Sequence, residues 1–481
     1  MQDSDYDVAI IGGGVIGCAI ARELSRFRLQ TVVLEKNAEV GFGTSKTNSG
    51  IIHPGHDTSP QLLKGRLVVP GNALFDRLCL ELNFGFARIG QLNVARNEEE
   101  LALLDGLLAQ GKEKGVPGLA IWDKARLSKE EPNLSRDLVG ALYAPSAGVI
   151  NPYELAFALI ENAIDNEVEL RVGAPVVGID AQGDRLVLHT PEGRLRSAFV
   201  INCAGLFADQ VARFVSCDTF TIKPRKGEEY MLDKRLRGLV RRLIFPVPTK
   251  TTKGTLIIPT FDGTIMVGPT ADDVEDCDDV TTTPEGATNV FQTVKSLCPA
   301  IEARDAITAF AGLRAVADSN DFIIGTTAVR GFINVAGIQS PGLTSAPAIA
   351  NHVRDILIDE GLTLKPRSRF RAKVAGPPRF SLQSPKDQEE SVLQNPLFGK
   401  VVCRCELVTE AEIHDAIDHG ATTLDGIKFR SRAGMGRCQG GFCTSRCMEV
   451  LSARLGAPLE DITKRGPGSE LTYAISSKTE S

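Results

Sequence analysis

A glycine-rich turn between an apolar strand and a helix lies near the N-terminus and constrains the fold most. Asp7 begins the run Asp-Val-Ala-Ile-Ile, which predicts a buried strand, and residues 15–24 follow a helical pattern. Between them, Gly12, Gly14 and Gly17 have the spacing Gly-x-Gly-x-x-Gly. The first glycine permits a tight turn, the second lets a pyrophosphate approach the backbone, and the third lets helix and strand pack closely. The segment therefore predicts a βαβ unit that binds a dinucleotide.

Other residues of this unit extend the prediction. Residues 31–35 form a second strand that ends in Glu35, which we expect to bind ribose hydroxyls. The phosphates would lie at the helix N-terminus, where unpaired N–H groups and the helix dipole favour negative charge. Two features favour FAD over NAD: a loop at 41–55 rich in Gly, Ser, Thr and Asn, and a second glycine turn at 337–344 that opens a late helix. That turn has the alternative reading of an ordinary loop–helix junction.

Size and charge set limits on the function. A chain of 481 residues predicts two or three domains. Its net charge of −6 gives no basic footprint for nucleic acid. The sequence contains neither an apolar run long enough to span a membrane nor a recognisable signal peptide. We therefore expect a cytoplasmic protein, and peripheral association with the inner face of the membrane through a partner stays open.

Cysteines cluster near the C-terminus. Of 11 cysteines, five lie between Cys403 and Cys447, and the others are read as small buried apolar residues. Cys403 and Cys405 form a Cys-x-Cys pair, and Cys438 and Cys443 follow after 32 residues. Such clustering indicates metal rather than disulfides in an intracellular protein. Four thiolates suit a two-iron cluster; a four-thiolate zinc site and a reduced, metal-free set are the alternatives.

Three segments carry a resemblance to a known family. Residues 44–53 (Thr-Ser-Lys-Thr-Asn-Ser-Gly-Ile-Ile-His), 310–314 and 334–344 resemble the D-amino-acid oxidase superfamily of flavoproteins. Within it they are similar to the branch of FAD-dependent glycerol-3-phosphate dehydrogenases and oxidases and L-2-hydroxyglutarate dehydrogenases. The resemblance covers about residues 5–360. The cysteine segment resembles the small all-helical [2Fe–2S] domain of bacterioferritin-associated ferredoxin, which also occurs at the C-terminus of some glycerol-3-phosphate dehydrogenases.

The resemblance implies an architecture of three parts. We expect a discontinuous α/β FAD-binding domain of Rossmann type, a mainly antiparallel β substrate domain that covers the flavin, and a small all-α iron–sulfur domain. The expected boundaries are 1–80, 150–215 and 311–362 for the FAD-binding domain, 81–149 and 216–310 for the substrate domain, 363–399 for a proline-rich linker, 400–462 for the [2Fe–2S] domain and 463–481 for a tail.

The resemblance also implies site residues. His53 is the expected catalytic base, because an imidazole titrates near neutral pH. Arg314 is expected to hold the substrate's anion bidentately, with Lys250, Lys253 and Ser340 as further substrate contacts. The expected metal ligands are Cys403, Cys405, Cys438 and Cys443. The expected FAD contacts are Gly12, Gly14, Gly17, Glu35, Lys36, Thr44, Ser45, Asn48, Ser49, Val176, Ala204, Gly205, Gly337, Pro341, Gly342, Leu343 and Thr344.

These expectations define a reaction. An anionic secondary alcohol, foremost sn-glycerol 3-phosphate, would transfer a hydride to flavin N5 and become dihydroxyacetone phosphate. Electrons would then leave through the cluster to a redox partner protein or a quinone-linked subunit, and a homo- or hetero-oligomer is compatible with this. The alternatives are an L-2-hydroxyglutarate or other 2-hydroxy-acid dehydrogenase, an amine oxidase of the same superfamily, and an electron-transfer subunit of a larger dehydrogenase.

Overall fold

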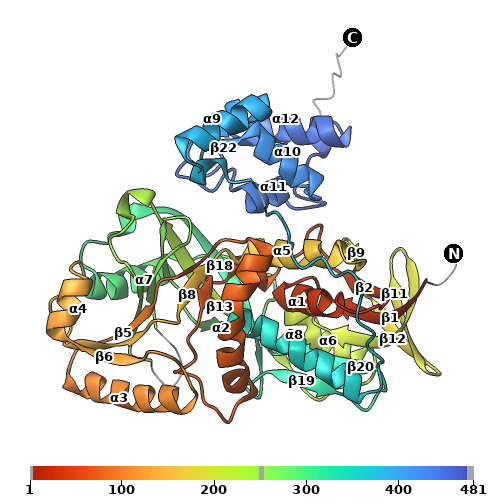
Figure 1. The fold of residues 1–481 in the computed structure, drawn as a ribbon, viewed down its shortest axis with the longest axis horizontal. Coiled ribbons are helices and arrows are strands. Elements are labelled where there is room, and N and C mark those ends of the chain that lie inside the picture. Colours follow the sequence, from red (N-terminus) through yellow and green to blue (C-terminus); the bar gives the residue numbers. More distant parts are fainter. Residues whose placement is uncertain (1–3, 249–253, 377, 474–481) are drawn as a thin grey trace. The chain divides into compact units, whose positions relative to one another are not determined.

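The chain forms two compact units (Figure 1). A computed structural model describes residues 4–248, 254–376 and 378–473. The first unit comprises residues 1–36 and 40–374, and the second comprises residues 37–39 and 375–481. We describe each unit separately.

An eight-stranded sheet forms the centre of one part of the first unit. Its strands run in the order β10-β11-β12-β1-β2-β9, and β20 pairs with β12 and β19. The pairs β1–β12, β1–β2, β2–β9 and β12–β20 are parallel. Strands β2 and β20 are buried throughout, as expected for parallel strands covered on both faces. The strands are β1 (Ser4–Ile11), β2 (Thr31–Leu34), β9 (Glu169–Arg171), β10 (Gly178–Gln182), β11 (Arg185–Thr190), β12 (Gly193–Asn202), β19 (Ile323–Thr326) and β20 (Phe332–Ala336). Because they come from distant parts of the chain, the predicted discontinuous α/β architecture is confirmed.

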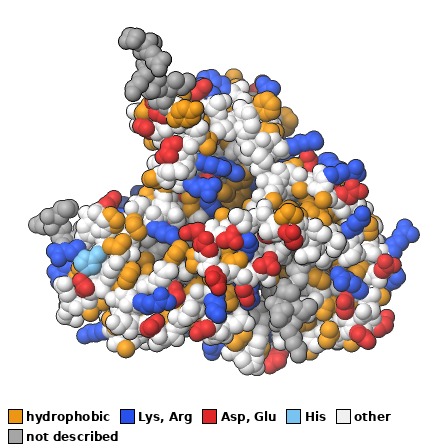
Figure 2. Space-filling view, turned by 180° about the vertical axis from the view of Figure 1, so that it is seen from behind, with side chains coloured by type: hydrophobic (Ala, Val, Ile, Leu, Met, Phe, Trp, Pro, Cys, Tyr) orange, Lys and Arg blue, Asp and Glu red, His pale blue; other side chains and the backbone are white. Residues whose placement is uncertain are grey.

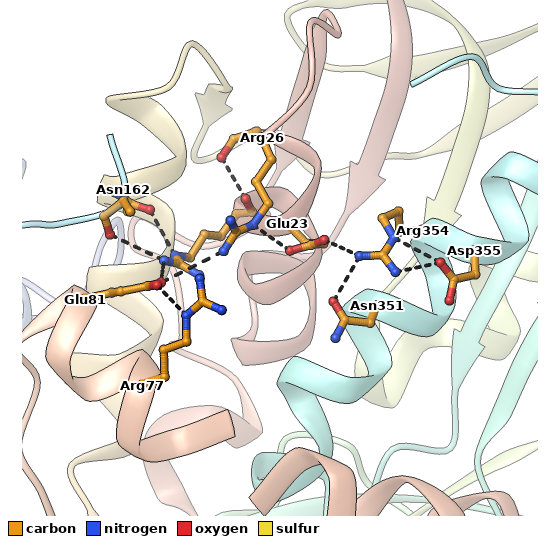
Figure 3. A network of polar contacts seen from close by, with 11 residues as sticks. Glu23, Arg26, Arg77, Glu81, Asn162, Asn351, Arg354 and Asp355 are labelled. Carbon is orange, nitrogen blue, oxygen red and sulfur yellow. Dashed lines mark hydrogen bonds and ion pairs between the residues drawn. The ribbon is translucent and has the colours of Figure 1, made fainter. Parts of the chain in front are cut away.

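Helices pack against one another beside this sheet. They are α1 (Val15–Leu24), α2 (Leu63–Leu82), α5 (Pro152–Ile164), α6 (Ala208–Arg213) and α8 (Gly342–Asp359). Helix α1 contacts α5 and α8, and α2 contacts α8. A network of ion pairs connects three of them (Figure 3): the Glu81 carboxylate on α2 accepts from Arg22 of α1, and Arg354 of α8 lies 2.6 Å from Glu23 of α1. Arg22 is buried, so its pairing with Glu81 neutralises a charge that would otherwise oppose packing.

A nine-stranded, mostly antiparallel sheet forms the other part of the first unit. Its path is β17-β13-β16-β15-β14-β5-β7-β6, with β18 paired along β13, and only β14–β5 is parallel among these pairs. The strands are β5 (Gln91–Ala95), β6 (Ala120–Asp123), β7 (Gly140–Ala144), β13 (Ile222–Leu232), β14 (Leu243–Pro246), β15 (Leu256–Pro259), β16 (Ile265–Gly268), β17 (Asp272–Asp273) and β18 (Ala306–Ala317). Helices α3 (Glu98–Glu113), α4 (Lys124–Glu130) and α7 (Pro284–Leu297) pack on it.

A small three-stranded sheet adjoins these elements. It contains β3 (Ile51–Ile52), β4 (Phe86–Arg88) and β8 (Gly148–Ile150). Strands β4 and β5 separate helix α2 from helix α3. Asn83 adopts a left-handed conformation (φ 51°) that ends α2, and Asn tolerates this region better than most residues. Three- and five-residue strands are too short to give a clear alternation in the sequence.

The second unit is small and mainly helical. It contains α9 (Pro385–Gln394), α10 (Glu410–Asp418), α11 (Leu424–Ser431) and α12 (Thr444–Leu455), which confirms the predicted small helical domain. A short two-stranded sheet of β21 (Val401–Cys403) and β22 (Val408–Thr409) accompanies these helices. Ile413, Ile427 and Leu451 lie in its core. Thr409 and Glu412 form a capping box that starts α10.

Ordered elements also lie outside the predicted bounds of the [2Fe–2S] domain at both ends. Helix α9 lies inside the predicted linker, because Ser384 caps its first turn and a proline is favourable at the first helical position. The earlier part of that linker packs along the first unit, where Arg371 N–H donates to Asn166 Oδ1 over 2.9 Å. At the other end, Thr463 O accepts from Leu424 N–H, so the predicted tail begins within ordered structure.

The helices and the surface charge were compared with the requirements for crossing a membrane and for binding nucleic acid. No helix among residues 4–248, 254–376 and 378–473 is long and apolar enough to span a bilayer. Acidic and basic side chains are interspersed over the face drawn in Figure 2. That distribution agrees with the small negative net charge of −6.

Candidate functional site

The glycine turn after β1 has the geometry that its spacing predicts. Gly12 adopts φ 105°, and a Cβ atom there would lie 2.4 Å from the Cys203 carbonyl oxygen. A Cβ atom on Gly17 would lie 2.0 Å from the Gly12 carbonyl oxygen. Gly14, which has no side chain, is the N-cap of α1 and leaves the first turn of the helix open. The turn therefore requires glycine at two positions and exposes a helix N-terminus, which fits a bound pyrophosphate.

Side chains around this turn hold its shape. The Glu35 carboxylate, at the end of β2, accepts from the Gly13 N–H over 2.8 Å. The Ser45 hydroxyl accepts from the Val15 N–H over 2.9 Å. The Lys36 ammonium lies 3.6 Å from the centre of the Phe207 ring. Glu35 thus stabilises the turn itself. It also lies at the end of β2, where the sequence predicts a contact with the ribose.

The loop between β2 and β3 is fixed by its own polar side chains. Asn48 donates to the Ser45 carbonyl over 2.6 Å and accepts from the Gly50 N–H over 2.8 Å. The Thr44 hydroxyl donates to the Leu313 carbonyl of β18 over 2.7 Å. The Ser49 hydroxyl donates to Glu229 of β13. The loop therefore joins the predicted flavin site to the antiparallel sheet.

His53 and the late glycine turn lie side by side. The backbone N–H of His53 donates to the Thr344 hydroxyl over 2.9 Å, and its Nε2 is 3.3 Å from the Ser340 hydroxyl. Thr344 is in the first turn of α8, where Pro341 is the N-cap. The structure thus brings together residues that are 287 positions apart in the sequence. Their arrangement can hold an imidazole beside a helix N-terminus.

The remaining predicted FAD contacts surround the ends of the parallel strands. Gly337 follows β20 with φ 66°, and Gly342 and Leu343 open α8. Gly205 begins a 3-10 turn with φ 58°, and Ala204 N–H donates to Asn202 Oδ1 over 3.3 Å. Val176 packs, partly buried, against the core beside β10. Crevices at the carboxyl ends of parallel strands are the usual nucleotide sites of such sheets.

Arg314 extends along one face of the antiparallel sheet. It lies opposite Arg225 across the β13–β18 pair, and its guanidinium donates to the carbonyls of Lys226 (3.4 Å) and Thr270 (3.3 Å). A Cβ atom on Gly227 would lie 2.4 Å from Arg314 Nη2, so this glycine leaves the space that the guanidinium occupies. Burial lowers the pKa of Arg314, and the nearby Glu229 carboxylate opposes this shift.

Glu229 is a site residue that the sequence analysis missed. Its side chain is 2% exposed, and burial raises its pKa to about 7, although the Ser49 hydroxyl and Arg314 favour the ionised form. The available signal was the pair of adjacent glutamates at 228 and 229, because alternation along a strand must direct them to opposite faces.

A second histidine, His56, lies three residues after His53 in the chain. His56 is fully buried and its Nε2 lies 3.0 Å from Asn93 Oδ1, which indicates a structural role rather than contact with a substrate. His53, by contrast, contacts Ser340 and Thr344 at the start of α8. Lys250 and Lys253 lie outside the described residues.

The four predicted metal ligands approach as two pairs in the second unit. Cys405 Sγ is 3.6 Å from Cys438 Sγ, and the Cys403 thiol interacts with Cys443, the N-cap of α12. Burial opposes ionisation of Cys438, but Cys405 and the backbone N–H groups of residues 440–442 together lower its pKa. The described residues contain no group of three or more ligands gathered around one point. Two thiol pairs with backbone donors fit a two-iron cluster better than a single tetrahedral zinc. Cys447 lies beside Cys443.

Comparison with known proteins agrees with this geometry. The family model "FAD dependent oxidoreductase" matches residues 7–356. The chain belongs to that family. A second model, "BFD-like [2Fe-2S] binding domain", matches residues 401–453. The protein is therefore an FAD-dependent oxidoreductase with a [2Fe–2S] domain, and that domain indicates electron transfer to a partner.

Individual relatives narrow the comparison. The chain is 43% identical to a glycerol 3-phosphate dehydrogenase of Caloramator mitchellensis over 99% of both chains. It is 33% identical to a glycerol 3-phosphate oxidase of Mycoplasma genitalium, over 73% of this chain and 94% of that one. Human mitochondrial L-2-hydroxyglutarate dehydrogenase is 30% identical over 56% of this chain and 61% of its own. The solved structure of L-alpha-glycerophosphate oxidase from Mycoplasma pneumoniae with FAD bound has a TM-score of 0.74 at 30% identity, and the match covers 78% of this chain and 99% of that one.

Proposed function

We propose that this protein is a dehydrogenase that oxidises sn-glycerol 3-phosphate to dihydroxyacetone phosphate. The observation that carries the proposal is the Arg314 guanidinium, which makes no ion pair within the described part of the chain and contacts only two carbonyl oxygens. A partly buried guanidinium attracts an anion, because burial penalises a cation, and the nearby Glu229 carboxylate makes no ion pair with it. The whole-chain similarity to a glycerol 3-phosphate dehydrogenase supports a phosphate as that anion.

The chain's own residues would bind the substrate and move one proton. Arg314 holds the phosphate, and His53 accepts the hydroxyl proton of the carbinol through Nε2. Ser340, 3.3 Å from that nitrogen, orients the ring. FAD, when bound, supplies the acceptor for the carbinol hydride. Gly12, Gly14 and Gly17 leave room for its pyrophosphate. The first turn of α8 would favour negative charge on the flavin ring.

The four paired cysteines of the second unit would hold the cluster, which carries single electrons when bound. We infer that these electrons pass to a redox partner protein or a quinone-linked subunit. The protein would then work in the cytoplasm and meet the inner face of the membrane through that partner. The cluster domain supports this inference, because a chain that passed electrons only to O2 would not need a one-electron carrier.

Oxidation of L-2-hydroxyglutarate is the second candidate. One bidentate guanidinium matches a carboxylate, and Arg314 is the guanidinium at this position. Relatives that oxidise this hydroxy acid are about 30% identical to the chain.

Anaerobic reduction of the purified protein separates the candidates. We expect sn-glycerol 3-phosphate to bleach the flavin absorbance, and L-2-hydroxyglutarate, L-lactate and proline to bleach it far more slowly. Arg314→Ala should raise the KM, and His53→Ala should slow bleaching without loss of FAD. Bleaching by L-2-hydroxyglutarate alone would refute the proposal in favour of the second candidate.

A further inference from the structure

Glu229 faces the space between the loop at 44–53 and the antiparallel sheet. In the β13–β18 pair, Glu229 lies opposite Phe310, and Arg225 opposite Arg314. Alternate residues of a strand share a face, so Glu229 points to the same side as Gly227, where the Arg314 guanidinium lies. The hydrogen bond from Ser49 fixes which side this is.

His53 borders the same space. Its ring centre is 6.1 Å from that of Phe245 in β14. Phe245 packs in one core cluster with Ile51 of β3, and Met231 and Phe310 contact that cluster from the face that bears Glu229. The sheet face with Glu229 and Arg314 therefore meets the loop that ends in the proposed catalytic base.

One oxygen of Glu229 has no protein partner among the residues that the structure describes. Oε1 accepts from the Ser49 hydroxyl, whereas Oε2 is buried and has no hydrogen-bond partner within the part of the chain that the structure describes. A buried carboxylate oxygen without a partner is costly, so its presence in a site indicates a ligand donor. Because the residue is 2% exposed, bulk water does not supply that donor.

We propose that Glu229 determines substrate specificity: Oε2 accepts a hydrogen bond from the hydroxymethyl group next to the carbinol, and the carboxylate repels a substrate that carries a carboxylate there. The inference rests on the proposed function. In glycerol 3-phosphate the carbinol has a phosphate-bearing arm on one side and a hydroxymethyl group on the other. In a 2-hydroxy acid, a carboxylate replaces the hydroxymethyl group. Adjacent positions for Arg314 and Glu229 would thus hold opposite ends of the first substrate and reject the second.

The test compares substrates that differ by this one hydroxyl. We would measure anaerobic flavin reduction by sn-glycerol 3-phosphate and by its 1-deoxy analogue, propane-1,2-diol 1-phosphate, at pH 8, above the pKa of Glu229 of about 7. For the unmodified protein we expect kcat/KM to favour the first by about 10- to 100-fold, the usual range for a hydrogen bond to a charged group. In Glu229→Leu this preference should fall to about twofold.

Glu229→Gln tests the charge separately. The amide keeps the length of the side chain and an acceptor oxygen, so part of the preference for glycerol 3-phosphate should remain, whereas L-2-hydroxyglutarate should become a better substrate by about tenfold or more. Equilibrium binding of dihydroxyacetone phosphate and hydroxyacetone phosphate to the oxidised protein gives a readout without turnover. If Glu229→Leu does not fold, the same binding measurement on Glu229→Gln tests the role of Glu229.

Glu228→Gln is the matched control. Glu228 lies next to Glu229 and is equally buried, but it faces α7 and accepts from Thr283 and Tyr230. We expect its substitution to leave the substrate ratio unchanged. An unchanged ratio and unchanged product binding in both Glu229 variants would overturn the inference. Failure of glycerol 3-phosphate to bleach the unmodified protein would instead refute the proposed function.

Discussion

Gly227→Ala should displace the Arg314 guanidinium without removing it. A Cβ atom at this position would lie 2.4 Å from Nη2 and 3.0 Å from Cζ of Arg314, far inside normal contact distances. The Pro269 Cβ atom would lie 3.0 Å away and needs to shift by only a few tenths of an ångström, whereas the end of the long Arg314 side chain can move freely, so we expect the protein to fold and retain FAD. The substrate's anion would lose its partner. A hydrogen bond between charged groups contributes about 1.5–3 kcal/mol, which predicts a rise in KM of about 10- to 150-fold.

Steady-state kinetics with glycerol 3-phosphate and a dye acceptor would measure this change. Gly325→Ala in β19 is the matched control, since a Cβ atom there would meet no atom within 4 Å, and its KM should not change. Arg314→Ala gives the change in KM that results from complete loss of the guanidinium. If Arg314→Ala raised KM but Gly227→Ala changed it by less than about twofold, the position of the guanidinium would be wrong. No effect of either substitution would remove Arg314 from the substrate site.

Three further predictions concern the cofactors and stability. Gly17→Ala should yield protein with little FAD, because the new Cβ would lie 2.0 Å from the Gly12 carbonyl oxygen; a normal flavin-to-protein absorbance ratio would contradict this. Cys438→Ser should lose iron and the signal of a reduced cluster in electron paramagnetic resonance, while glycerol 3-phosphate still bleaches the flavin; full iron content would exclude Cys438 as a ligand. Glu229→Gln should gain stability relative to the unmodified protein as the pH rises from 4.5 to about 7, because the folded protein holds the Glu229 proton more tightly than the unfolded chain and loses stability as that proton leaves. The difference of about 2.5 between these pKa values corresponds to about 3 kcal/mol in all, of which about 2.5 kcal/mol falls between pH 5 and pH 8. Urea unfolding of the apoprotein at these two pH values should show this gap, and an equal difference at both would count against it.

The sequence predicted those parts of the protein whose local pattern has one physical meaning. The glycine triplet permits only a tight strand–turn–helix, and the structure has it at Gly12 and Gly17. A Cys-x-Cys pair with two later cysteines has few uses besides metal, and the thiols lie in two pairs. These features appear as short sequence motifs with characteristic spacing, so they could be recognised without the fold.

Features that depend on distant contacts could not be predicted. Glu229 became a site residue only because β13 pairs with β18 and faces Ser49, 180 positions earlier. Its sequence context does not distinguish it from Glu228, which is structural. Helix α9 was also missed, because prolines and charges suggest a linker unless the capping by Ser384 is considered.

Anaerobic titration of the purified protein with sn-glycerol 3-phosphate, followed by optical and electron paramagnetic resonance spectra, tests whether substrate electrons pass from the flavin to the cluster. We expect bleaching of the flavin and then the rhombic signal of a reduced [2Fe–2S] cluster in the same sample. A flavin that stays oxidised, or a bleached flavin beside a cluster that dithionite reduces but the substrate never does, would contradict it.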